Sequence, residues 1–152
     1  MLKRIFPAQF DNVYRGYWPA VWLLVPLVLG KLAMGVNVMI NTRDIIEGVD
    51  GIPLSSFSVE AQKNLVFSFQ AWALELFLLA ALGLLALVRY RAMVPLVYLL
   101  LLVENAGRKA ISLASGSPLI PPSGPSTATL INMSLIAALL IGFALSIGRR
   151  DS

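Results

Sequence analysis

The sequence of 152 residues contains neither cysteine nor histidine. These two absences exclude disulfides, thiol nucleophiles, cysteine-held iron–sulfur clusters, histidine-held haem and the usual zinc sites. They also remove the commonest general base near neutral pH. We therefore expect no metal site and no covalently bound cofactor. A redox role would need a bound quinone, another non-covalent cofactor or a partner subunit.

Charged residues are also scarce, at 13% of the chain, against about 25% in typical soluble domains. Hydrophobic residues make up 58%, and the mean hydropathy is +0.79. This composition indicates an integral membrane protein. The net charge of +4 comes from small basic groups beside apolar segments, as membrane orientation requires. It does not indicate nucleic-acid binding.

Four apolar stretches predict an all-α fold, an integral membrane four-helix bundle with one transmembrane domain over residues 1–152. The spans are expected at about 18–40, 65–88, 92–114 and 128–147, with external loops at 41–64 and 115–127. Before the second span, "FSVEAQ" places Ser58 where a helix N-cap is expected.

The third span is the least obvious, because "YLLLLVENAGRKAIS" at 98–112 introduces charged residues after an apolar run. From residue 92 to 103 the apolar run is shorter than the roughly 20 residues that a span needs. The basic residues decide the question. Four spans put all three basic clusters on one side, which the positive-inside rule makes the cytoplasm; these clusters are Lys3, Arg4 and Arg15, then Arg89 and Arg91, then Arg149 and Arg150. In the external 41–64 loop, Arg43 and Lys63 are outnumbered by four acidic residues. We therefore expect both termini on the cytoplasmic side of the membrane.

Several polar side chains then fall within the expected spans or at their ends. Lys31, Glu75 and Glu104 lie at similar depths in the first, second and third spans, and Arg108 lies nearer the outer end of the third. Asn37 and Asn41 share a face at the outer end of the first span, and Asn105 follows Glu104. Ionisable residues within a membrane usually face the protein interior and pair with each other. Two interpretations stay open: a neutralised network that fixes helix register, or a buried site for a ligand or proton. Whether Lys31, Glu75 and Glu104 meet depends on helix rotation.

The fourth span carries small residues at intervals of four: Ser134, Ala138, Gly142 and Ser146. Such a ridge lets two helices approach closely. It predicts packing within the bundle, with the helix of a partner subunit as the alternative.

Two segments carry a family resemblance. "LGKLAMG" at 29–35 and "ALELFLLAALGLLALVRYRAMVPLVYLLLLVENAGRK" at 73–109 resemble the DoxX-like group of small bacterial membrane proteins. "DGIPL" and "RYRAMVPL" also resemble an uncharacterised bacterial membrane family of similar size. The DoxX-like resemblance implies a four-helix bundle in which Lys31 and Glu75 occupy recurrent positions. It also implies an association with quinone-linked or thiol-linked redox complexes, although this chain has no cysteine for a thiol role.

The first expectation for function is a non-catalytic accessory subunit of a larger bacterial membrane complex, in contact with lipids and other membrane subunits. The alternative is an independent binder or carrier of an apolar molecule, such as a quinone, lipid or sterol-like compound. In that case the Lys31, Glu75, Glu104 and Arg108 group would hold the polar end. A third hypothesis is proton transfer through Glu75 and Glu104, and an enzyme in its own right is the least favoured.

Overall fold

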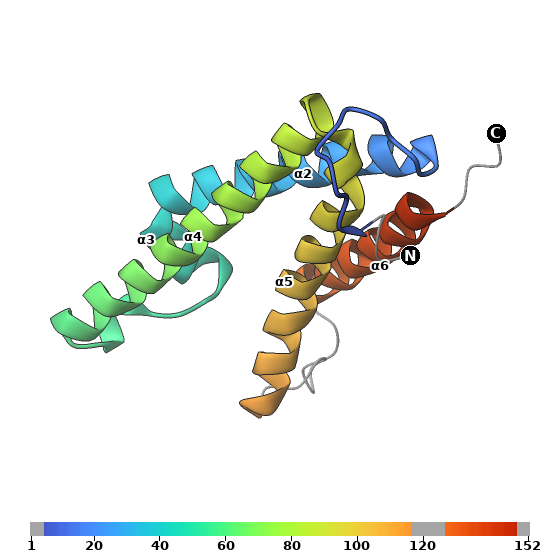
Figure 1. The fold of residues 1–152 in the computed structure, drawn as a ribbon. Helices are drawn as coiled ribbons and strands as arrows, with labels where there is room; N and C mark the ends of the chain where they lie inside the picture. The colour runs from blue at the N-terminus through green and yellow to red at the C-terminus, as the bar shows by residue number, and fades with distance from the viewer. Residues whose placement is uncertain (1–4, 117–126, 149–152) are drawn as a thin grey trace. The chain divides into compact units, whose positions relative to one another are not determined.

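The computed structural model describes residues 5–116 and 127–148. Every regular element in these two ranges is a helix, which confirms the all-α prediction for this part of the chain (Figure 1). The long helices are α2 (Trp18–Ile40), α4 (Val59–Val88), α5 (Val94–Ala114) and α6 (Thr127–Ile147). The short ones are α3 (Thr42–Asp44), the π-helical turn η1 (Ile45–Val49), and the 3₁₀ turns η2 (Leu54–Ser56) and η3 (Arg91–Met93).

The chain forms two compact units. Met1–Leu27 and Gly83–Ser152 make up the first, called here the terminal unit, and Val28–Leu82 make up the second, the middle unit. The basic residues Lys3, Arg4, Arg149 and Arg150 and positions 117–126 of the expected second external loop lie outside the described residues.

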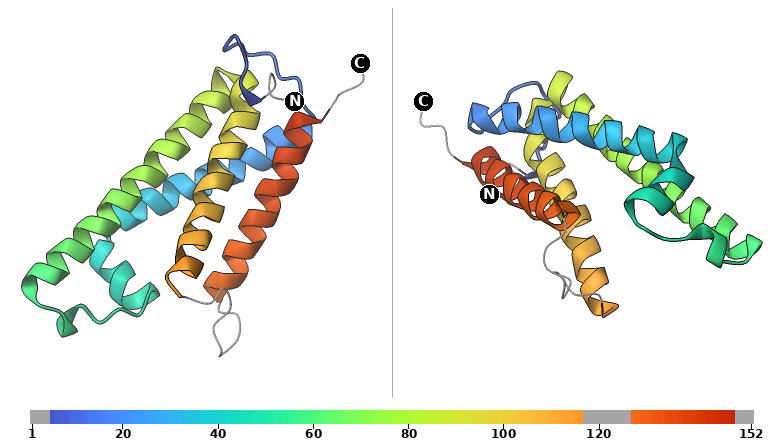
Figure 2. Two further views of the ribbon diagram at one scale, coloured as in Figure 1. Left: turned by 60° about the horizontal axis from the view of Figure 1, so that its bottom comes forward. Right: turned by 180° about the vertical axis from the view of Figure 1, so that it is seen from behind.

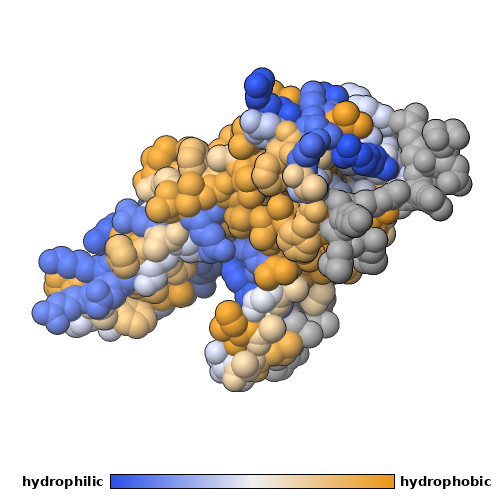
Figure 3. Space-filling model, viewed as in Figure 1, coloured by the Kyte–Doolittle hydropathy of each residue, from blue (hydrophilic) through white to orange (hydrophobic). Residues whose placement is uncertain are grey.

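Within the described ranges, three helices are long and apolar enough to cross a membrane: α2, α4, and α6 from Leu130 to Ile147. Apolar side chains accordingly cover much of the visible helix surface (Figure 3). This agrees with the prediction of a membrane protein. The fourth long helix, α5, has 21 residues and runs without a break through Glu104, Arg108 and Lys109. It is not among these three helices, and its three charged residues lie close together, between residues 104 and 109.

The helix ends follow local sequence signals. Helix α2 has the bounds expected for the first span, and Pro26 lies inside it without ending it. Helix α4 begins six residues before the expected span, because the Ser58 Oγ accepts a hydrogen bond from the Ala61 N–H at 3.3 Å. The predicted N-cap is thus confirmed. The segment "VEAQKN" that follows is polar but forms a helix readily, so the helix extends beyond its apolar part.

In the terminal unit, α5 and α6 pack side by side and run in opposite directions (Figure 2). Tyr98 of α5 is fully buried, and its hydroxyl donates a hydrogen bond to the Ala20 carbonyl of α2 at 2.7 Å. Its ring lies directly against Gly142 of α6. One side chain of α5 therefore contacts both α2 and α6. Other large, fully buried side chains of the terminal unit are Leu24, Val94, Val97, Leu101 and Leu139.

In the middle unit, α2 and α4 approach closely at Gly35. A Cβ at Gly35 would lie 3.1 Å from both the Ala73 carbonyl oxygen and the Phe77 nitrogen, so a side chain here would push against the backbone of α4 and glycine favours the close approach. The expected 41–64 loop is largely structured. Ile46 and Leu54 are buried within it, and Gly51, with φ +67, makes the turn that a side chain would strain.

The contact between Tyr98 and Gly142 generates the first prediction. Gly142→Ala introduces a methyl group that overlaps the Tyr98 ring, and that ring is fully buried. We expect a loss of about 1–3 kcal/mol in the free energy of unfolding, as overpacked cores show. Urea unfolding in detergent micelles, followed by circular dichroism, measures it.

The matched control is Gly107→Ala in α5, where nothing lies within 4 Å of the added carbon. That variant should be neutral or slightly stabilised, because alanine favours helix over glycine. Equal stability of the two variants would contradict the packing of α6 against Tyr98.

Candidate functional sites

The first candidate site is a polar cluster on α5 formed by Glu104, Asn105 and Arg108. It belongs to the terminal unit. Glu104 and Asn105 are buried, with 9% and 4% of their surface exposed, in a helix that is apolar on either side of them. Since an unsatisfied buried carboxylate is costly, its local contacts matter.

Two neighbours on the same helix contact the carboxylate. The Asn105 amide donates a hydrogen bond to Glu104 Oε2 at 2.6 Å and another to the Leu101 carbonyl at 2.8 Å. The Arg108 Nε lies 3.2 Å from Glu104 Oε1, one helical turn away. The side chain of Arg108 is 40% exposed, whereas that of Glu104 is 4% exposed. The cluster is therefore accessible at its arginine and closed at its carboxylate.

The remaining predicted site residues lie in the middle unit. Lys31 is half-buried on α2, and Glu75 is exposed on α4. Within this unit Glu75 forms no ion pair among the described residues. Asn37 and Asn41 are exposed, and the Asn41 amide donates a hydrogen bond to the Asn37 side-chain oxygen at 2.8 Å. Two predicted pairs with a spacing of four residues are in contact: Asn37 with Asn41, and Glu104 with Arg108. Glu75 forms no ion pair with Lys31 in the described structure.

The small-residue ridge on α6 is used unevenly. Gly142 and Ser146 are buried in the terminal unit, against Tyr98 and beside Gly16 respectively. Ala138 is half-buried, and Ser134 is exposed. The half of the ridge nearer the C-terminus packs within the chain, whereas Ser134, at the other end of the ridge, is exposed on the surface.

A second candidate site lies where the N-terminal segment, residues 5–17, meets turn η3 and the end of α6. The Tyr17 N–H bonds to the Leu145 carbonyl at 3.1 Å, and the Ala92 N–H bonds to the Asp11 carbonyl at 3.3 Å. Hydrophilic side chains gather near the N-terminal segment (Figure 3). We call this region the basic end, after its exposed or half-buried Arg15, Arg89 and Arg91.

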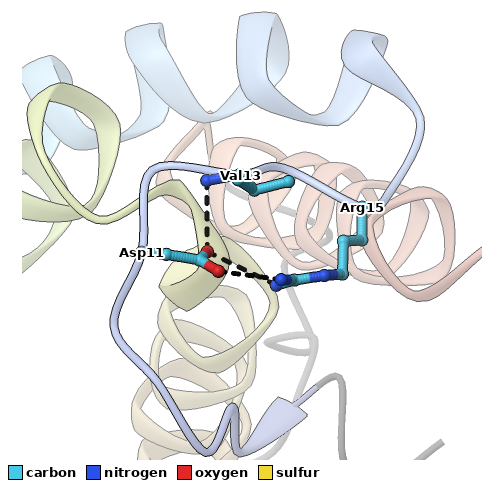
Figure 4. A network of polar contacts seen from close by, with 3 residues as sticks. All are labelled: Asp11, Val13 and Arg15. Atoms are coloured by element: carbon cyan, nitrogen blue, oxygen red, sulfur yellow. Dashed lines mark hydrogen bonds and ion pairs between the residues drawn. The ribbon is translucent and has the colours of Figure 1, made fainter.

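A single carboxylate organises the N-terminal segment at the basic end. Asp11 Oδ2 accepts a hydrogen bond from Arg15 Nη2 at 2.8 Å, and Asp11 Oδ1 accepts one from the Val13 N–H at 3.1 Å (Figure 4). The Arg15 hydrogen bond is the main cause that lowers the pKa of Asp11 below its ordinary value of 3.8. Nearby, burial raises the pKa of Tyr14 to about 12.

Aromatic rings meet the basic groups at this end. The Arg91 guanidinium lies 5.4 Å from the centre of the Trp18 ring, a cation–π distance. Arg91 Nε also donates a hydrogen bond to the Leu87 carbonyl at 3.2 Å, near the end of α4. Phe10 meets Tyr90 edge to face at 6.4 Å. An open groove lies beside that pair, lined by Phe10, Asn12, Val88, Arg89 and Tyr90.

The sequence analysis missed Tyr98, the Asp11–Arg15 pair and the groove. The four-residue spacing of Asp11 and Arg15 was a signal that could have revealed their pairing, although the segment that contains them is not helical. The position of Tyr98 within the apolar run "LVYLLLLV" could have indicated a contact between helices, because a buried tyrosine hydroxyl usually has a hydrogen-bond partner.

Comparison of the chain with models of protein families, with curated proteins and with solved structures gave no significant match. The function must therefore be argued from the residues and contacts described above.

The α5 cluster generates the second prediction. Arg108→Gln removes a cation next to the buried Glu104 carboxylate. We expect a loss of about 1–2 kcal/mol in the free energy of unfolding, less than for a fully buried pair because the arginine is partly in solvent. Chemical unfolding in micelles measures the loss.

Lys109→Gln is the matched control, because it removes the same charge from the next residue, which is also half-buried. It should change stability by under about 0.5 kcal/mol. Adding Glu104→Gln to Arg108→Gln should recover part of the loss, since a neutral amide needs no cation. Equal losses in Arg108→Gln and Lys109→Gln would contradict this role of the ion pair.

The Asp11–Arg15 pair generates a pH-dependent prediction. The pKa of Asp11 is lowered in the folded chain, so the pair contributes stability above pH 3.8 and loses it as the pH falls through the lower, folded pKa. Asp11→Asn should therefore be less stable than wild type at pH 6, and the two should converge below pH 3.8. Thermal unfolding from pH 3 to 6 measures the difference. A constant difference over this range would contradict the assignment.

Proposed function

We propose that this protein is a small non-catalytic integral membrane protein that serves as an accessory subunit of a larger bacterial membrane complex. The observation that carries the proposal is Glu75, an exposed carboxylate in the apolar helix α4. Its exposed neighbours Leu74 and Leu78 suit lipid tails. The carboxylate does not, because ionisable groups within a membrane pair with polar groups.

A helix from another subunit would supply such a polar group. The exposed Ser134 on α6 supports the same conclusion, because a small residue lets a neighbouring helix approach closely. Two separate helices therefore offer surface that suits a protein partner better than lipid. The lack of cysteine and histidine fits a subunit that leaves chemistry to its partners.

In the proposed topology, α5 is a fourth span. Three observations in the terminal unit support it. Helix α5 begins next to turn η3 at the basic end, α6 ends there beside Tyr17, and the two helices pack against each other in opposite directions. A helix that starts where a membrane-spanning neighbour ends, and lies alongside it, has to cover the same distance.

Orientation follows from the charges. Arg15, Arg89 and Arg91 all lie at the basic end, and the positive-inside rule assigns that end to the cytoplasm. The N-terminal segment and the end of α6 meet there. We therefore propose a bacterial inner-membrane protein with both termini in the cytoplasm.

A second candidate function is the binding of an apolar molecule such as a quinone, a lipid or a sterol-like compound. The uneven exposure of the α5 cluster favours it. Arg108 is 40% exposed beside the closed Glu104, so its guanidinium could hold the polar end of a ligand whose apolar part lies along α5.

One experiment separates the two functions. The full chain with a C-terminal tag is purified from native membranes in mild detergent, and co-purifying proteins and lipids are identified by mass spectrometry. We expect a stoichiometric membrane-protein partner. Glu75→Leu should lower the amount of retained partner about tenfold, since a polar contact between membrane helices contributes about 1–2 kcal/mol.

The matched control is Glu60→Leu, which removes an exposed carboxylate from the first turn of the same helix. It should retain the partner fully. A chain that purifies without any protein partner would overturn the accessory role, as would equal retention by the two variants. A defined apolar molecule that is retained instead, and lost in Arg108→Gln, would establish the second candidate.

A further inference from the structure

We infer that the groove formed by Phe10, Asn12, Val88, Arg89 and Tyr90 binds the headgroup of an anionic phospholipid. All five residues belong to the terminal unit. The groove combines one cation, one side-chain amide and a tyrosine hydroxyl with apolar walls. Its residues come from two segments far apart in the sequence, the N-terminal segment and the end of α4.

The position of the groove gives its depth in a membrane. Val88 is the last residue of α4, a helix apolar enough to span, and Arg89 follows it directly. Tyr17 and Trp18 lie at the start of α2 at the same end, and aromatic residues of this kind mark the headgroup level. The groove therefore opens where lipid phosphates lie.

The charges at the basic end leave one arginine for a ligand. Arg15 is paired with Asp11 at 2.8 Å. Arg91 donates to the Leu87 carbonyl and lies over Trp18. Arg89 is exposed in the groove and forms no ion pair with the described part of the chain. An anion would complement it, and the Asn12 amide can donate hydrogen bonds to the same anion.

The apolar walls specify the rest of the ligand. Phe10 is 60% exposed and Val88 is 74% exposed, and Leu85 is exposed one turn earlier on α4. A free phosphate would contact only the polar half of this surface. A phospholipid fits both halves, with its phosphate at Arg89 and Asn12 and an acyl chain along Val88 and Leu85. The edge-to-face contact of Phe10 with Tyr90 holds the N-terminal wall in place.

The test uses the full chain, purified in a neutral detergent and titrated with phosphatidylglycerol or phosphatidylcholine of the same acyl chains. Native mass spectrometry counts the bound lipid. Wild type should prefer phosphatidylglycerol. Arg89→Gln should weaken binding of that lipid about fivefold, as expected for one basic residue near an anionic surface, and should leave phosphatidylcholine binding unchanged. Asn12→Ala should weaken phosphatidylglycerol binding about twofold.

The matched control is Arg43→Gln, which removes an exposed arginine from α3 in the middle unit. It should bind phosphatidylglycerol as wild type does. If Arg89→Gln and Arg43→Gln weakened phosphatidylglycerol binding equally, the effect would come from the overall charge of the protein, and the proposed site would be overturned. Equal binding of the two lipids by wild type would overturn it too, and so would equally tight binding of soluble glycerol phosphate. Since no partner protein is present, the outcome is independent of the accessory role.

Discussion

The terminal unit depends on the contacts of Tyr98. Its hydroxyl bonds to the Ala20 carbonyl of α2, and its ring fills the space left by Gly142 on α6. These contacts join three helices through one rigid side chain. They hold the start of α2 and the last part of α6 near each other, and the N-terminal segment then lies across η3 and the end of α6. In the same unit, Phe10 and Asn12 of the N-terminal segment line the groove with Arg89.

Polar side chains in the apolar helices are handled in two different ways. On α5, Glu104 has its amide and guanidinium contacts on the same helix, so these depend little on how the helix is rotated. On α4, Glu75 is left exposed among leucines. The first arrangement is largely complete within the chain and suits a structural role or a closed end of a ligand site. The second is incomplete, and membrane physics requires a polar neighbour for it. The contrast is the physical basis for proposing a protein partner at α4.

The sequence predicted what depends on local spacing. The bounds of α2, the Ser58 cap and the Glu104–Arg108 pair all follow from residues within one or two turns of each other. Contacts between helices could not be predicted, because hydropathy does not determine helix rotation. The ridge on α6 illustrates the difference. Its small residues predicted a close approach, but nothing local identified Tyr98 as the side chain that fills the space at Gly142. The start of α4 was misplaced because hydropathy locates the apolar part of a helix and not its first hydrogen bond.

The groove lies at the polar, basic end of the chain, whereas the exposed Glu75 lies in the apolar part of α4. This difference in surroundings leads to different expected roles. At the basic end the ligand groups are arginine, amide and aromatic ring, which water and lipid headgroups can also solvate. An empty groove there costs little, so lipid can bind and leave. Glu75 lies within the apolar part of α4, where a carboxylate without a polar partner is costly. A contact at Glu75 is therefore expected to persist, whereas the groove is expected to exchange lipid. The same chain could thus be held in a complex through α4 while its basic end responds to the lipids around it.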